Sequence, residues 1–145
     1  ISAGADNQKI QSFIFQNNSL NSIRLLGYSL SEKLRVLHDF KTGYITLSLK
    51  ELEKFNYKQG DMEGLVNYAT SIKGIRFAAL LTERKDRIKL SFRSTGKFPT
   101  NKVAKDHFNG GGHVNASGGE YYGTLEEAEE LFVSILPEYR KELLK

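Results

Sequence analysis

The most regular hydrophobic pattern in the chain lies between residues 75 and 94 and predicts two paired strands. Over residues 87–94, apolar residues occupy every second position, with lysine, serine and arginine between them. This period of two places the apolar side chains on one face of a strand. Residues 75–83 are apolar almost throughout, which indicates a strand buried on both faces. The charged turn at 84–86 then favours an antiparallel hairpin whose first strand is central in a sheet.

A second pair of strands is predicted earlier in the chain, at residues 34–40 and 44–49, with a hairpin turn at 41–43. Ile45, Leu47 and Leu49 would alternate inward on the second of these strands. His38 falls on the first strand, where a lone histidine is more often a packed or edge residue than a ligand. A further short strand is expected at residues 121–122, because tyrosine favours strands.

Apolar residues spaced three and four apart predict helices between and around these strands. Ser19 would cap a helix whose apolar stripe needs a neighbour to pack on, and Thr124 with Glu127 forms a capping box before a helix that Pro137 should end. The other predicted helices cover residues 6–15, 50–55, 62–71, 101–107 and 138–145. The expected fold is therefore α/β, or α+β in detail, with a mixed sheet of about five strands, flanking helices and an N-terminal helical arm.

Composition narrows the class of protein. With 145 residues, of which 39% are hydrophobic and 26% charged, the chain suits one globular domain. It has no cysteine, and no apolar run approaches the roughly 20 residues that span a bilayer, so we expect a cytoplasmic protein without disulfides. The net charge of +4 fits an acidic partner such as a nucleotide, but also plain solubility. Because the first residue is Ile1, we expect a fragment of a longer protein.

The clearest candidate for function is residues 109–119, which contain five of the 13 glycines. Three consecutive glycines add no packing, but they let the backbone reach positive φ and let a ligand come close. Successive N–H groups can then converge on an anion, as they do in phosphate loops. His113, directly after the glycines, adds a donor whose charge changes near neutral pH. A flexible surface loop without a ligand is the alternative interpretation.

The stretch Gly-Gly-Gly-His-x-x-Ala-Ser-Gly at 110–118 resembles the signature of the C-terminal substrate-binding domain of the DHH (Asp-His-His) phosphoesterases. The resemblance is to the nano-RNase/pAp-phosphatase type, which is related to exopolyphosphatases. Leu-Ser-Phe-Arg-Ser at 90–94 is similar to the family's strand whose Arg-Ser pair contacts substrate. Asn109 stands where the family usually has another glycine, and asparagine tolerates the left-handed conformation better than most residues.

The resemblance implies a division of the chain and a site. Residues 1–33 would be a helical linker and the end of a catalytic domain, and residues 34–145 would be the substrate-binding domain. The site would hold the phosphate or terminal nucleotide of a short single-stranded oligonucleotide or a nucleoside phosphate. Its residues would be Arg93, Ser94, Gly110, Gly111, Gly112, His113, Asn115, Ala116 and Ser117.

We expect no catalytic or metal-binding residue in this chain. Asp106 and His107 are followed by Phe108, so they do not form an Asp-His-His motif, and the three histidines fall on different elements. The resemblance implies two metal ions, usually Mn²⁺ or else Mg²⁺, in an N-terminal DHH domain of the same parent, which would be a hydrolase. We expect no membrane partner. The sequence is compatible with a homodimer but does not determine the oligomeric state.

Two other functions remain compatible with the sequence. One is a non-catalytic nucleic-acid-binding module, such as the tail domain of an alanyl-tRNA synthetase-like protein. The other is an interaction domain in which the glycine segment is only structural. If the chain belongs to a DHH phosphoesterase, its sequence does not distinguish between a linear oligonucleotide, a cyclic dinucleotide and pAp as the substrate.

Overall fold

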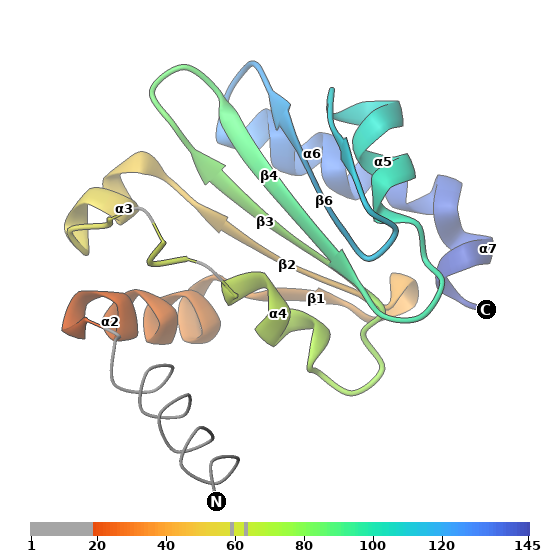
Figure 1. Ribbon diagram of the computed structural model, residues 1–145, viewed down its shortest axis with the longest axis horizontal. Coiled ribbons are helices and arrows are strands. Elements are labelled where there is room, and N and C mark those ends of the chain that lie inside the picture. The colour runs from red at the N-terminus through yellow and green to blue at the C-terminus, as the bar shows by residue number, and fades with distance from the viewer. Residues whose placement is uncertain (1–18, 59, 63) are drawn as a thin grey trace, which may run out of the picture.

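The protein folds around one mixed sheet of six strands in the order β1-β2-β3-β4-β6-β5 (Figure 1). The computed structural model describes residues 19–58, 60–62 and 64–145, so the helix predicted at 6–15 lies outside the described residues. Strands β2 and β3 are parallel, and all other neighbours are antiparallel. The predicted α+β class with a mixed sheet is confirmed, with six strands where about five were expected.

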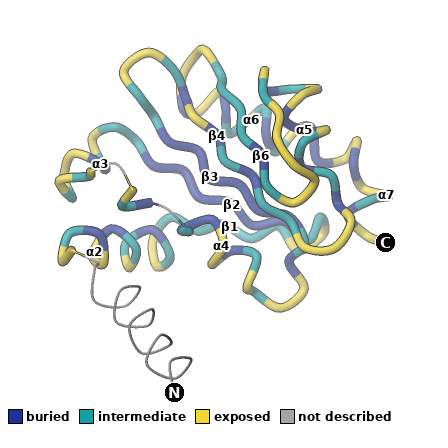
Figure 2. The backbone as a smooth tube through the Cα atoms, viewed as in Figure 1, coloured by how far each residue is buried: buried dark blue, intermediate teal, exposed yellow. Residues whose placement is uncertain are grey.

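The strands are β1 (Arg35–Leu37), β2 (Thr42–Leu47), β3 (Phe77–Glu83), β4 (Ile88–Ser94), β5 (Gly111–Gly112) and β6 (Ala116–Tyr121). Burial is greatest along β2 and β3, in the middle of the sheet (Figure 2). The predicted hairpin is confirmed, because β3 and β4 pair antiparallel from Phe77 opposite Ser94 to Glu83 opposite Ile88. The central position of β3 follows from its apolar character on both faces.

Helices cover both faces of the sheet (Figure 1). We call the two sides the α4 face and the α6 face. On the α4 face lie α2 (Leu20–Tyr28), the π-helix η1 (Ser29–Lys33), α3 (Leu49–Lys54) and α4 (Leu65–Thr70). On the α6 face lie α5 (Thr100–His107), α6 (Leu125–Ile135), the 3-10 helix η3 (Leu136–Tyr139) and α7 (Arg140–Leu143). Each side has its own buried apolar cluster, and the sheet separates them.

The predicted strand at 34–40 is too long, and the turn after it is misplaced. The chain leaves β1 at Leu37, forms a 3-10 turn over His38–Phe40 (η2), and reverses at Lys41, which has a left-handed φ of 49°. His38 therefore lies in this turn and is exposed. Thr42 is already in β2, because it pairs with Phe77, and its hydroxyl donates to Phe40 O at 2.9 Å.

Three other predicted boundaries also move. Leu49 starts α3 instead of ending a strand, because Ser48 forms a capping box with Glu51. The helix predicted at 62–71 is only α4, which follows Gly64. The strand expected at 121–122 is the end of β6, which starts at Ala116. By contrast, the Thr124 capping box is confirmed, and α6 ends at Ile135 before Pro137.

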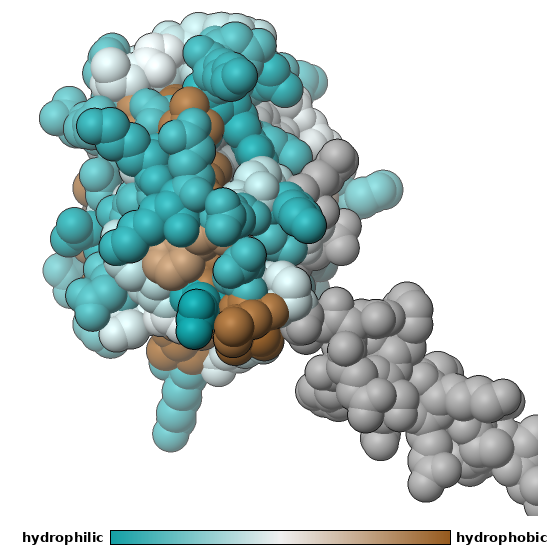
Figure 3. All heavy atoms as spheres, turned by 90° about the vertical axis from the view of Figure 1, so that its left-hand side faces the viewer, coloured by the Kyte–Doolittle hydropathy of each residue, from teal (hydrophilic) through white to brown (hydrophobic). Residues whose placement is uncertain are grey.

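Helix α2 is attached to the α4 face through one side only. Ser19 caps it as predicted, by accepting from Ser22 N, and Leu25 is 1% exposed. Leu20 and Ile23, from the apolar stripe of the sequence, are 63% and 48% exposed. Packing of this stripe on a neighbour stays a prediction. The view of Figure 3 shows hydrophobic patches on an otherwise mostly hydrophilic side of the molecule.

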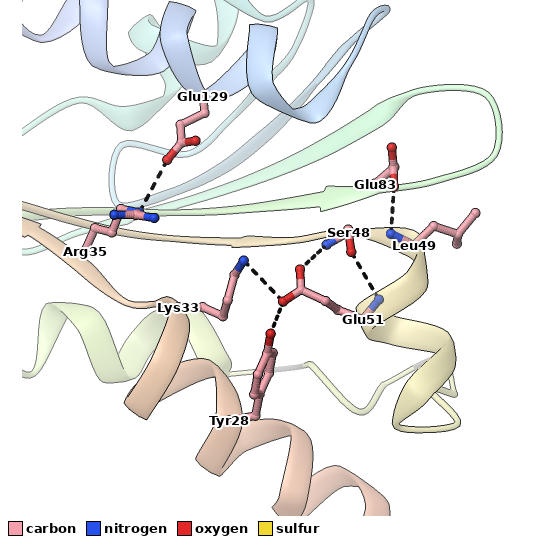
Figure 4. A network of polar contacts seen from close by, with 8 residues as sticks. All are labelled: Tyr28, Lys33, Arg35, Ser48, Leu49, Glu51, Glu83 and Glu129. Atoms are coloured by element: carbon pink, nitrogen blue, oxygen red, sulfur yellow. Dashed lines mark hydrogen bonds and ion pairs between the residues drawn. The ribbon is translucent and has the colours of Figure 1, made fainter.

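A polar network joins α2 and η1 to α3 (Figure 4). The Tyr28 hydroxyl donates to the Glu51 carboxylate, and Lys33 Nζ lies 3.2 Å from the same carboxylate. The hydrogen bond to Glu51, together with burial, raises the pKa of Tyr28 to about 12. Burial works against ionisation of Glu51, but donation from Tyr28, the Ser48 amide and Lys33 outweighs it and lowers the pKa of Glu51. None of the described helices has the length and apolar character needed to cross a membrane.

Candidate functional site

The glycine segment is a β-hairpin at the edge of the sheet and not a loop. Gly111 of β5 lies opposite Gly118 of β6, and Gly112 lies opposite Ser117. The hairpin closes where the His113 amide donates to Ala116 O at 2.8 Å. The small residues Ala116, Ser117 and Gly118 therefore form the start of β6.

The glycines of this hairpin meet different surroundings. A Cβ on Gly110 would overlap the carbonyl oxygen of Gly118, and a Cβ on Gly112 would lie 2.7 Å from Ser117 Cα. Gly112 also has a φ of 144°, which other residues rarely adopt. A Cβ on Gly111 would have nothing within 4 Å. The packing of the hairpin therefore requires glycine at 110 and 112, whereas position 111 has open space beside it.

Asn109 leads into the hairpin with a left-handed φ of 48°. This is the conformation that we expected asparagine to keep at a position where the DHH family usually has glycine. The chain reaches this position from α5, and the Gly110 amide donates to Ala104 O at 3.0 Å. Phe108, fully buried beside Phe92 with ring centroids 5.5 Å apart, fixes the end of α5 on the sheet.

The turn of the hairpin is anchored to the end of β4 by polar contacts. Asn115 Nδ2 donates to Ser94 Oγ and to Gly96 O, both at 2.9 Å. Ser94 Oγ in turn donates to Phe98 O at 2.8 Å. Two of the predicted binding side chains, Ser94 and Asn115, thus contact each other and hold the hairpin beside β4.

The side chain of Ser117 does not share the orientation of Arg93. Its side chain is 8% exposed and its Oγ donates to Thr100 Oγ1 at 2.8 Å, at the start of α5. It lies opposite Phe92, a member of the buried cluster on the α6 face. Ser117 therefore lies on the side of the sheet away from Arg93.

Arg93 shares the α4 face with the open part of the hairpin. It lies opposite Ala116, while Gly118, two residues further along β6, lies opposite Gly111 of β5. Because side chains alternate along a strand, Arg93, Ala116 and Gly118 have the same orientation. One guanidinium nitrogen, Nη1, donates to Phe92 O at 2.8 Å, and Arg93 makes no other hydrogen bond to a described residue. The guanidinium thus keeps donors for a ligand.

His113 directly follows β5, at the exposed tip of the hairpin. Its backbone is held firmly, because its carbonyl oxygen accepts from Thr100 Oγ1 at 3.2 Å. Its imidazole makes no hydrogen bond to a described residue, so the ring is available to a ligand or to water. The structure thus brings the backbone of His113 close to Arg93 through the β5–β6–β4 pairing.

A cleft of about 270 Å³ opens on the α4 face beside Arg93. Three of its lining residues are basic, namely Arg84, Lys89 and Arg93, and none of the described lining residues is acidic. The other wall comes from the segment around α4; the remaining lining residues are Tyr57, Gly60, Met62, Gly64, Val66, Leu80, Thr82 and Ser91. The glycine hairpin is not among them, so Arg93 lies between the hairpin and the cleft.

Sequence reasoning selected Arg93 but not its neighbours Lys89 and Arg84. The signal for Lys89 was present, because the alternation of β4 put it on the face of Arg93. Arg84 was assigned to a turn. Tyr57 had no signal at all, because it comes from an irregular segment whose position depends on tertiary packing.

Among the residues that the structure describes, no group of three His, Asp or Glu side chains converges to hold a metal ion. Asp106 and His107 have partners on η3: the Tyr139 hydroxyl donates to Asp106 at 3.2 Å, and His107 Nε2 lies 2.9 Å from Glu138. This surface lies on the α6 face, away from the cleft.

Comparison with known proteins assigns the chain to a family. The family model described as "DHHA1 domain" matches residues 41–142, which include β2 to α6 and both candidate segments. The chain belongs to the DHHA1 domain family. The predicted membership in the DHH-associated domain family is therefore confirmed.

Curated relatives of this DHHA1 domain are named as nucleases. It is 30% identical over 129 residues to the bifunctional oligoribonuclease and PAP phosphatase NrnA of Bacillus subtilis, and 36% identical over 104 residues to the probable NrnA of Streptococcus mutans. These matches cover 88% and 70% of the chain but 34% and 30% of the relatives. The DHHA1 domain thus spans about a third of the length of these curated relatives.

Solved structures share the fold. An exopolyphosphatase-related protein from Bacteroides fragilis superposes with a TM-score of 0.94 at 44% identity, over 99% of this chain and 42% of that chain. The C-Ala domain of alanyl-tRNA synthetase from Aquifex aeolicus superposes with a TM-score of 0.53 at 16% identity, over 72% of this chain and 97% of that chain. The second likeness shows a shared fold and nothing finer.

Proposed function

We propose that this chain is the substrate-binding domain of a DHH-type phosphoesterase that acts on short oligonucleotides or nucleoside phosphates. The names of the two curated relatives support this substrate class. Because the chain spans about a third of those relatives, the catalytic DHH domain and its Mn²⁺ or Mg²⁺ ions would belong to the rest of the parent protein. The role of this chain would be to bind and orient the substrate.

The observation that carries the proposal is the strand register, in which Arg93, Gly118 and Gly111 have the same orientation on the sheet. A guanidinium can grip a phosphate with two parallel N–H groups. The hairpin adds backbone donors. His113 and Ala116 exchange hydrogen bonds at the turn, so the antiparallel alternation leaves the Gly112 N–H pointing outward from the edge strand.

Position 111 would provide the space for the ligand. A Cβ at Gly111 would meet no protein atom within 4 Å, so glycine is not needed there for packing. A phosphate held between Arg93 and the hairpin would come close to the backbone at this position. Ser94 and Asn115 would then act by holding the hairpin in register with β4, because their side-chain groups bond to each other.

The proposal is tested by titrating the ¹⁵N-labelled chain with pAp and following backbone amides by NMR. We expect the largest shifts at Arg93, Gly111, Gly112 and His113. The Arg93→Ala variant should bind at least about tenfold more weakly, because a hydrogen bond to a charged group contributes about 1.5–3 kcal/mol.

Arg24→Ala is the matched control, because Arg24 is exposed on α2 and does not line the cleft. Equal effects of the two arginine variants, or shifts confined to other surfaces, would contradict the phosphate site.

A non-catalytic nucleic-acid-binding module would also bind its ligand at this site, so binding alone does not separate the two functions. An activity assay of the parent protein does, because the parent of such a module would bind oligonucleotides through Arg93 without hydrolysing them.

A further inference from the structure

The cleft on the α4 face extends away from the proposed phosphate site. Its volume of about 270 Å³ is slightly below the range typical of ligand sites, about 300–1,000 Å³. Arg93 stands at one end of β4, next to the glycine hairpin, and Lys89 stands near the other end. The cleft therefore continues along β4 beyond Arg93, and its far end can take a phosphate and part of a nucleoside.

Lys89 and Arg93 are separate positive charges. They are four residues apart on one face of β4, so their Cα atoms are about 13 Å apart. Strand side chains stand roughly perpendicular to the sheet, so one phosphate group would not contact both. Two phosphates of one chain would fit the two charges better.

Lys89 is not neutralised by any residue that the structure describes. It is exposed and forms no ion pair with any residue that the structure describes. Glu120 lies directly opposite Lys89 on β6, but its carboxylate is 3.3 Å from Arg87 Nε and accepts from the Tyr122 hydroxyl at 2.7 Å.

Arg84 is held in place at the same end of the cleft. Its guanidinium lies 5.0 Å from the centre of the Tyr57 ring, and its Nη2 donates to the Tyr57 hydroxyl at 3.2 Å. An arginine already positioned in this way loses less side-chain entropy when it binds an anion. The cleft also has an apolar part, formed by Met62, Val66 and Leu80, that suits a nucleoside.

We propose that Arg84, Lys89 and Tyr57 form a second subsite for the next nucleotide of a linear oligonucleotide. This rests on the proposed function, because Arg93 and the hairpin would hold the first nucleotide. Lys89 and Arg84 bind the second phosphate, and the nucleoside lies against the apolar part of the cleft. The domain then prefers a linear chain of nucleotides over a mononucleotide.

The test compares the affinity of the chain for AMP and for the linear trinucleotide pApApA by isothermal titration calorimetry. Wild type should bind the trinucleotide more tightly. In Lys89→Gln, the ratio of trinucleotide to AMP affinity should fall about tenfold, which is the effect of losing one charged hydrogen bond. The slope of log affinity against log salt for the trinucleotide should also decrease by about 0.7, as expected for one lost phosphate contact on a single strand.

Lys85→Gln is the matched control, because it removes the same charge from the exposed β3–β4 turn outside the cleft. Lys89→Arg should keep the wild-type ratio. Equal ratios in Lys89→Gln and Lys85→Gln would overturn the second subsite, as would an unchanged ratio in Lys89→Gln. A wrong assignment of the Arg93 site would give a different result, because Arg93→Ala would then leave the affinity for AMP unchanged. The trinucleotide affinities of Lys89→Gln and Lys85→Gln would still test the second subsite.

Discussion

Gly110 and Gly111 are neighbours with the same side chain, but the fold treats them differently. The carbonyl oxygen of Gly118 occupies the place of a Cβ at position 110, and the space beside position 111 is open. A sequence pattern cannot express this difference, because it depends on how β5 lies against β6. The structure therefore separates a glycine required by the fold from one available for binding.

We predict that Gly110→Ala mainly lowers the stability of the fold, whereas Gly111→Ala mainly weakens ligand binding. Gly110→Ala should lower the free energy of unfolding by about 1–3 kcal/mol, because the backbone must shift to admit the methyl group. Gly111→Ala should change it by no more than about 0.5 kcal/mol and should weaken pAp binding, because the methyl group occupies the space of the ligand. Urea denaturation and calorimetric titration of both variants measure this, and equal losses of stability would contradict it.

The sequence selected Arg93 and the glycine segment as parts of one site, which stays a prediction. The strand register gives Arg93, Gly111 and Gly118 the same orientation on the sheet. Ser117 was grouped with them, although its side chain points to α5. The sequence of residues 116–121 is rich in glycine and has no strand-like pattern, so the alternation of side chains that turns Ser117 away from Arg93 could not be foreseen.

At the scale of elements, the attachment of α2 to α3 depends on two ionisable groups. The pKa of Glu51 is lowered below 4.5 in the fold, so its contribution to stability is present above that pH and is lost as the pH falls through the lowered pKa. The pKa of Tyr28 is raised from 10.0 to about 12, so its contribution is present below pH 10 and is lost as the pH rises toward 12.

We therefore predict that Tyr28→Phe is less stable than wild type at pH 7 but loses less further stability between pH 10 and pH 12. Glu51→Gln should likewise have a flatter stability profile below pH 4.5. Thermal melts across both ranges measure this. Tyr68→Phe, a change at an exposed tyrosine of α4, should follow the wild-type profile. Parallel profiles for Tyr28→Phe and wild type would exclude the coupling.

The elements that could be predicted are those whose pattern is local. The β3–β4 hairpin follows from the alternation within its own residues, and α6 follows from its capping box. The start of β2 could not be predicted, because Thr42 and Gly43 resemble a turn and enter the strand only through pairing with Phe77 and Ala78 of β3. These partners lie 35 residues further along the chain.

At the scale of the whole molecule, we predict that residues 1–145 alone bind a dinucleotide without hydrolysing it, even with Mn²⁺. Hydrolysis of a phosphodiester requires a strong nucleophile, which metal-bound hydroxide supplies. Arg93 and the hairpin amides can orient a phosphate and stabilise charge, but they do not generate hydroxide. Incubation of the purified chain with pApA and Mn²⁺, followed by chromatography, measures turnover. Hydrolysis that disappears in Arg93→Ala would show a catalytic site within this chain.

The order of the strands has a consequence for how the protein behaves at high concentration. The sheet ends in β1, with three residues, on one side and in β5, with two glycines, on the other. Long, flat edge strands recruit other chains into intermolecular sheets, and very short edges offer few hydrogen-bonding groups for such growth. The apolar strand β3 is paired with β2 from Phe77 to Thr82 and with β4 from Phe77 to Glu83. Strand β5, where the proposed phosphate site would find its backbone donors, therefore presents too short a run of them to seed amyloid-like aggregation.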